Sequence, residues 1–147
     1  AQTALSYIRS NAEHLNIKPD FFGNRDIHIH IPAGSIPKDG PSAGLTIAMA
    51  LISLLTDRPA RREVALSGEL TLSGRILPVS GIREKLLAAQ RAGVRVVILP
   101  QRNAADLNDI EEELKEGLEV VLVNEVDQNL LDKVLVPGEG RSQASIP

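Results

Sequence analysis

The spacing of apolar side chains predicts helices at several places along the chain. In residues 1–15, apolar side chains recur three or four positions apart, which indicates an amphipathic helix. Residues 41–55 are apolar almost all round the helical circumference, so we expect this helix to be buried in the core. Three further helices are expected at residues 81–92 (ended by Gly93), 103–115 (acidic and mostly exposed) and 125–134.

Other stretches carry the patterns of strands. Residues 26–31 alternate isoleucine with histidine or aspartate, which predicts a half-buried strand. Residues 63–77 predict two or three short strands, with Gly68 and Gly74 at the turns. Apolar runs predict two more strands, at residues 94–99 and 118–123.

This order of elements predicts one α+β domain. Strands and helices alternate in the second half of the chain but cluster in the first, and 147 residues suit a single domain. We therefore expect short sheets packed with a buried central helix over residues 1–135. Residues 136–147 have the composition of a disordered tail.

Composition and charge exclude several classes of protein. The chain has no cysteine, which rules out disulfides, thiolate metal sites and a cysteine nucleophile. A net charge of −3 and an aromatic content of 2% argue against nucleic-acid binding. No apolar run reaches the length that spans a bilayer and no secretory signal is present, so we expect no membrane contact and a cytoplasmic setting. The chain does not begin with Met, from which we expect a fragment of a longer protein or a processed product.

Ser42 is the first candidate for chemistry. Gly40 permits a tight turn and Pro41 suits a first helical position, which places Ser42 in the first turn of the buried helix. Unpaired backbone N–H groups and the helix dipole meet there and stabilise an anion, such as phosphate or the oxyanion of acyl transfer. The alternative is an ordinary helix start, because Ser and Pro are common in first turns.

A nucleophilic serine requires a base, for which histidine and lysine are both candidates. His28 and His30 lie on one face of the predicted strand, but no carboxylate stands out as a partner for either. They could equally form a polar strand face, and because no third ligand is evident we expect no metal site. Lys85 lies within about 60° of Ile82 and Ala89 on the predicted helix, hence on its inward face. Burial favours a neutral lysine amine, the state that a general base requires, although the side chain could instead extend its ammonium to water.

Three motifs in order carry a family resemblance. KDGPSAG at residues 38–44, LSGELTLSG at 66–74 and LPVSGIREK at 77–85 resemble the proteolytic domain of the Lon family of ATP-dependent proteases. The resemblance covers about residues 1–135 and implies the Lon-type α+β fold. It also implies a Ser–Lys dyad, with Ser42 as the nucleophile and Lys85 as the base.

The resemblance implies supporting roles for other residues. Ser67 stands where the family has a threonine that holds the lysine amine, and keeps the hydroxyl but not the methyl group. At two positions, Ala33 replaces a usual glutamate and Ser80 a usual glycine, which we expect to affect loop shape rather than chemistry. The remaining residues that match supporting positions are Asp39, Gly40, Pro41, His28 and His30.

The resemblance further implies the rest of a machine. An AAA+ ATPase module would bind ATP and Mg outside this segment, and the segment itself would hold no cofactor. The full protein is expected to be a homohexamer that degrades unfolded, damaged and regulatory proteins. Two other functions stay open: a nucleotide-binding or small-molecule kinase module of the GHMP type, whose serine loop holds phosphate, and a catalytically silent assembly domain.

Overall fold

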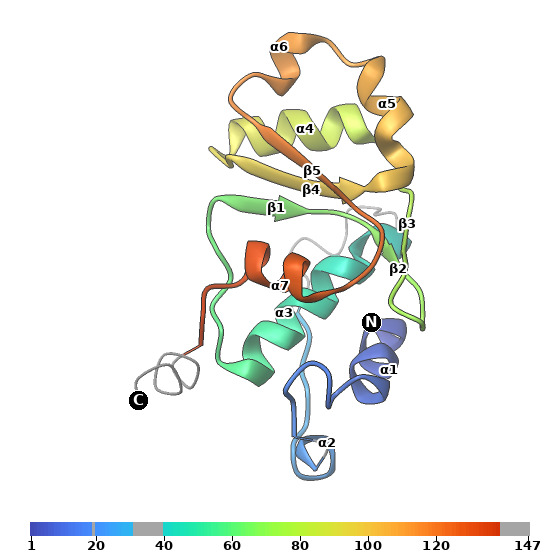
Figure 1. Ribbon diagram of the computed structural model, residues 1–147, viewed down its shortest axis with the longest axis vertical. Coiled ribbons are helices and arrows are strands. Elements are labelled where there is room, and N and C mark those ends of the chain that lie inside the picture. Colours follow the sequence, from blue (N-terminus) through green and yellow to red (C-terminus); the bar gives the residue numbers. More distant parts are fainter. Residues whose placement is uncertain (19, 31–39, 139–147) are drawn as a thin grey trace.

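A three-stranded parallel sheet lies at the centre of the computed structural model, which describes residues 1–18, 20–30 and 40–138 (Figure 1). Its strands are β1 (Val64–Leu66), β4 (Val96–Pro100) and β5 (Glu119–Val123), with β4 in the middle. β4 is parallel to both neighbours, and Ile98 is in register with Leu66 on one side and Val121 on the other.

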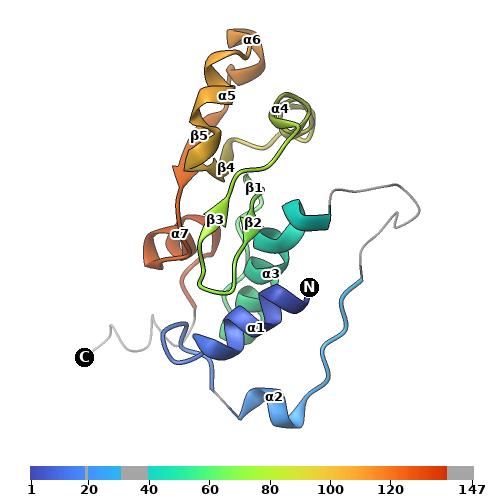
Figure 2. The same cartoon turned by 90° about the vertical axis from the view of Figure 1, so that its right-hand side faces the viewer.

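Helices cover both faces of this sheet (Figure 1). On one face lie α4 (Ile82–Arg91), α5 (Ala104–Asn108) and α6 (Glu112–Lys115). On the other lie α3 (Gly44–Thr56) and α7 (Gln128–Val134), and α1 (Gln2–Ser10) packs against α3. A short helix, α2 (Phe21–Asn24), stands apart from the sheet, as Figure 2 shows. Two 3₁₀ turns, η1 (Gly40–Ala43) and η2 (Gln101–Asn103), precede α3 and α5.

The side chains of β4 alternate between two apolar clusters. Ile98 is buried with the side chains of α1, α3 and α7, whereas Val97 and Leu99 are buried with those of α4. This period of two is what a strand with helices on both faces requires. The sheet and its two helical layers therefore form one α+β domain, which confirms the predicted fold class.

A short hairpin of β2 (Glu69–Leu70) and β3 (Ile76–Leu77) follows β1 beside the start of α3. The two or three strands predicted over residues 63–77 are therefore present. Gly74 turns the hairpin with φ +87°, and Gly68 lies where a Cβ would be 2.8 Å from Ile76 Cγ2. Both glycines thus have a steric reason to be glycine.

Several predicted elements differ from the observed ones. Residues 25–30 form no strand, so that prediction is wrong over its described part: the expected alternation is present, with Ile27 half-buried and His28 exposed, but no ladder partner pairs with it. The single helix expected at 103–115 is broken into η2, α5 and α6, because the chain turns at Asp109 to bury Ile110 beneath α4.

The first and second predicted helices, expected at residues 1–15 and 41–55, begin or end differently. α1 stops at Ser10, where Asn11 donates its backbone N–H and its side-chain amide to Tyr7 O. The helix expected from residue 41 starts as a 3₁₀ turn and becomes α-helical only at Gly44. It is also less buried than predicted, since Leu54 is 68% exposed. None of the described helices is long and apolar enough to cross a membrane.

The close approach at Gly68 yields a stability prediction. In Gly68→Ala, the new methyl group would press on Ile76 and Leu45, two buried side chains, and should lower the free energy of unfolding by about 1–3 kcal/mol. Gly23→Ala is the matched control, because a Cβ there meets no atom within 4 Å. Chemical denaturation of the three proteins measures the difference; equal stability of both variants would contradict the packing described for Gly68.

Candidate active site

A cavity of about 350 Å³ lies between the β1 edge of the sheet and α4. Its wall includes three polar side chains that the sequence singled out: Ser42, Ser67 and Lys85. They come from three separate elements, namely η1, the end of β1 and α4. The fold therefore brings together residues 43 positions apart at the extremes (85 − 42).

Ser42 is held by the turn that follows β1. Its carbonyl oxygen accepts the backbone N–H of Gly68 at 3.3 Å and the hydroxyl of Ser67 at 3.5 Å. The next turn of the chain is tied to the same place, because Leu45 N donates to Gly68 O at 3.1 Å. These backbone contacts fix the position of Ser42. The residue is half-buried, and its side chain borders the cavity.

Ser67 links this turn to the central strand. Its backbone N–H donates to Ile98 O at 3.1 Å, which continues the β1–β4 pairing by one residue. Its side chain is 9% exposed, and its described hydrogen bond goes to the carbonyl of Ser42 rather than to a lysine amine. The role that the resemblance implies for this hydroxyl stays a prediction.

Lys85 approaches the cavity from the first turns of α4. Lys85 is half-buried. This is intermediate between the two arrangements considered from the sequence, a buried amine and an ammonium that extends to water. Nζ donates to the carbonyl oxygen of Ser80 at 2.8 Å, so the amine is folded back over the start of the helix. Gly81 lies just before α4 with a φ of +71°, a backbone conformation that suits glycine.

The other predicted site residues are not among the described residues that line this cavity. Gly40 and Pro41 begin the 3₁₀ turn that presents Ser42. Asp39 lies outside the described residues, as do Ala33 and most of the predicted tail. His28 and His30 are exposed on residues 25–30 and are not among the described residues that line the cavity.

Small apolar side chains form most of the remaining wall. Ala88 and Ala89 of α4, and Ala92 directly after it, line the cavity together with Val97 and Leu99 of the sheet. Of these three alanines, only Ala89 is predicted by the helical pattern to lie on the inward face. The spacing of the three alanines, which puts them on one side of a helix, is the signal that could have revealed the rest. Thr46 also borders the cavity, and its hydroxyl donates to Leu66 O at 3.1 Å at the outer edge of β1.

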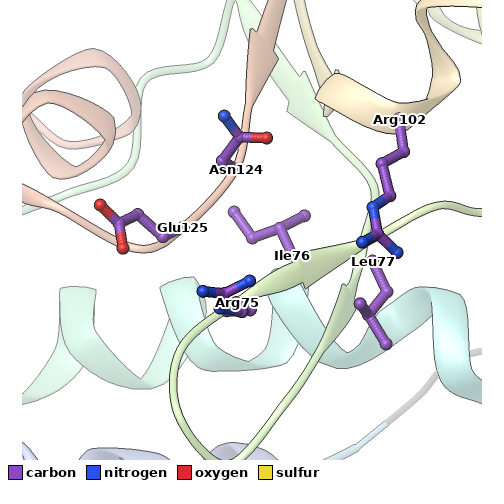
Figure 3. A pocket seen from close by; sticks show the side chains of 6 residues that line it. All are labelled: Arg75, Ile76, Leu77, Arg102, Asn124 and Glu125. Carbon is purple, nitrogen blue, oxygen red and sulfur yellow. The ribbon is translucent and has the colours of Figure 1, made fainter.

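A second, polar hollow of about 340 Å³ lies beside β3 and the end of β5 (Figure 3). Arg75, Arg102 and Glu125 project around it, with no serine, histidine or lysine among the described residues of its wall. The neighbouring Tyr7 has a raised pKa, first because it is buried and then because Glu125 and Asp127 are negative. That hydroxyl stays protonated at neutral pH, so Tyr7 supplies no base beside this hollow. In the described ranges no three His, Asp or Glu side chains gather as a metal site would require.

Comparisons with known proteins bear on the first cavity. The family model described as the Lon protease (S16) C-terminal proteolytic domain matches residues 1–137. The Lon protease of Roseiflexus castenholzii is 56% identical over 137 residues, which cover 93% of this chain and 17% of that protein. Lon protease 2 of Desulfotalea psychrophila is 51% identical over 96% of this chain and 18% of its own length. Lon protease 1 of Bacillus subtilis is 52% identical over 92% of this chain and 17% of its own length.

The chain thus spans less than a fifth of the length of these relatives, 17–18%. The family match covers nearly all of the described structure, including the serine turn, the β1–β2 turn and α4. The mixed α+β fold, the cavity that joins Ser42 with Lys85, and this match lead to one conclusion: the chain belongs to the Lon protease (S16) C-terminal proteolytic domain family.

Proposed function

We propose that this chain is the peptide-cleaving part of a longer, ATP-dependent Lon protease, and that it hydrolyses peptide bonds with a Ser42–Lys85 dyad. The observation that carries the proposal is the cavity wall, which Ser42 and Lys85 share with Ser67. Family membership supports the reaction class, and the geometry supports these two residues as the ones that perform it.

The proposed reaction passes through an acyl-enzyme. The unprotonated amine of Lys85 takes the proton of the Ser42 hydroxyl, whose oxygen attacks the scissile carbonyl. Backbone N–H groups at the start of α3 stabilise the oxyanion, and Lys85 then gives its proton to the leaving amine. A water molecule, activated by the same amine, releases the acyl group from Ser42.

One movement is needed before this chemistry. Lys85 Nζ is bonded to Ser80 O, and it must turn toward the Ser42 hydroxyl to accept a proton. The lysine stem has four rotatable bonds and both residues border one cavity, so we propose a change of side-chain rotamer as this movement. The structure thus supports a resting arrangement of the dyad.

The cavity wall also bears on the substrate. Its alanine, valine and leucine side chains fit an apolar side chain of a polypeptide better than a phosphate, which favours a peptidase over a GHMP-type kinase module. Apolar side chains are exposed in unfolded chains, so unfolded proteins are the substrates we propose. ATP and Mg would act in an AAA+ module outside this segment, and the full protein would assemble as a homohexamer in the cytoplasm.

Removal of either dyad residue tests the proposal. In the full-length protease, Ser42→Ala should abolish ATP-dependent cleavage of casein, and Lys85→Met should lower kcat by roughly 10²–10⁴-fold because the general base is lost. Arg91→Met is the matched control, since Arg91 is an exposed cation on the same helix, α4. ATP hydrolysis reports that each variant is folded. Undiminished cleavage by either dyad variant would contradict the assignment.

Filling the cavity tests the site for the substrate side chain. Ala88 lines the cavity but is itself exposed, so Ala88→Phe should occupy the space without disturbing the core. We expect kcat/KM to fall roughly 10–200-fold for peptides with leucine before the scissile bond, and much less for those with alanine. The matched control is Ala105→Phe, on the exposed side of α5. An equal loss for both kinds of peptide would contradict this use of the cavity.

A further inference from the structure

Asn103 is a buried polar residue that the proposed reaction does not use. Its side chain is 2% exposed, and it lies at the end of η2, directly after β4. Burying an amide is costly unless every polar atom finds a partner. An apolar side chain could fill the same space, so the hydrogen bonds of the amide should explain its presence.

The side-chain amide of Asn103 forms hydrogen bonds with both the backbone N–H and the backbone carbonyl of Val79. Val79 N donates to Asn103 Oδ1 at 3.0 Å, and Asn103 Nδ2 donates to Val79 O at 2.8 Å. The second hydrogen of Nδ2 goes to Asp106 Oδ2 at 2.7 Å. The side chain therefore replaces the neighbouring strand that Val79, which lies between β3 and α4, does not have.

Val79 is joined directly to the group that holds the lysine. The next residue is Ser80, whose carbonyl oxygen accepts Lys85 Nζ at 2.8 Å. Gly81 follows, and its carbonyl oxygen accepts the backbone N–H of Lys85 at 3.0 Å. The segment that Asn103 fixes thus determines both where α4 begins and where the amine rests.

We propose that Asn103 is a positioning residue for Lys85, acting through the backbone of residues 79–81, because the Gly81 carbonyl accepts the backbone N–H of Lys85 and so anchors the first turn of α4. This inference rests on the proposed function, because it assumes that Lys85 is the base. Asn103 closely follows the central strand of the sheet. Its two hydrogen bonds to Val79 therefore hold the segment before α4 in a fixed position relative to the sheet. Without Asn103, the segment before α4 loses two hydrogen bonds and the start of α4 is less fixed, so the amine approaches the Ser42 hydroxyl from a broader range of positions, most of them unproductive.

Kinetics of Asn103→Ala in the full-length protease test this role. We expect kcat for a fluorogenic peptide to fall roughly 10–100-fold, with KM nearly unchanged because the cavity wall is intact. Val120→Ala is the matched control. Val120 lies on β5 and packs in the same apolar cluster as α4, so its truncation weakens that cluster without touching the segment before α4. If Val120→Ala, at equal loss of thermal stability, lowers kcat as much as Asn103→Ala, or if only KM rises, the positioning role is wrong.

A pair of isosteric variants keeps the test valid if Asn103→Ala folds poorly. Asn103→Asp retains the acceptor for Val79 N but loses both donors and faces the carboxylate of Asp106. Adding Asp106→Asn restores a donor between the two side chains, so the double variant should recover several-fold in kcat over Asn103→Asp. No recovery would overturn the proposal.

Lys85→Met, assayed in parallel, separates the two claims. If it retains activity, the proposed function fails and the inference fails with it. If it is inactive while Asn103→Ala keeps its full kcat, only the positioning role of Asn103 is wrong.

Discussion

The central strand β4 is the element on which the rest of the structure depends. Its backbone pairs with β1 on one side and with β5 on the other. Its side chains alternate, with Ile98 packed in the cluster of α3 while Val97 and Leu99 pack in the cluster of α4. Because both helical layers share this one strand, neither can shift without breaking a ladder or opening a cavity in a core.

The same strand orients both halves of the candidate site. On one side, Ser67 donates its backbone N–H to Ile98 O and its hydroxyl to Ser42 O, which ties the serine turn to the sheet. Beyond the end of the strand, Asn103 binds the segment that precedes α4 and so reaches Lys85. Two residues distant in sequence thus share one rigid frame, as a site that depends on orientation requires.

Local patterns predicted much of this structure, and long-range contacts explain what they missed. The strands at β1, β4 and β5 and helix α4 followed from periodicity and turn residues, and Ser42 and Lys85, which the motifs single out, border one cavity. The strand expected at residues 26–31 had the correct alternation, but a strand also requires a partner, which no local pattern reveals. Asn103 gave no signal at all, because its role depends on a hydrogen-bond partner 24 positions away.

The distance between Ser42 Oγ and Lys85 Nζ in the working enzyme tests the central claim most directly. It can be measured in a crystal structure of the full-length protease with a peptide boronate bound to Ser42. We predict that Nζ has left Ser80 O and lies within hydrogen-bond reach of Ser42 Oγ, at about 2.7–3.2 Å. An amine still bonded to Ser80 O, beyond reach of the acylated serine, would contradict the dyad.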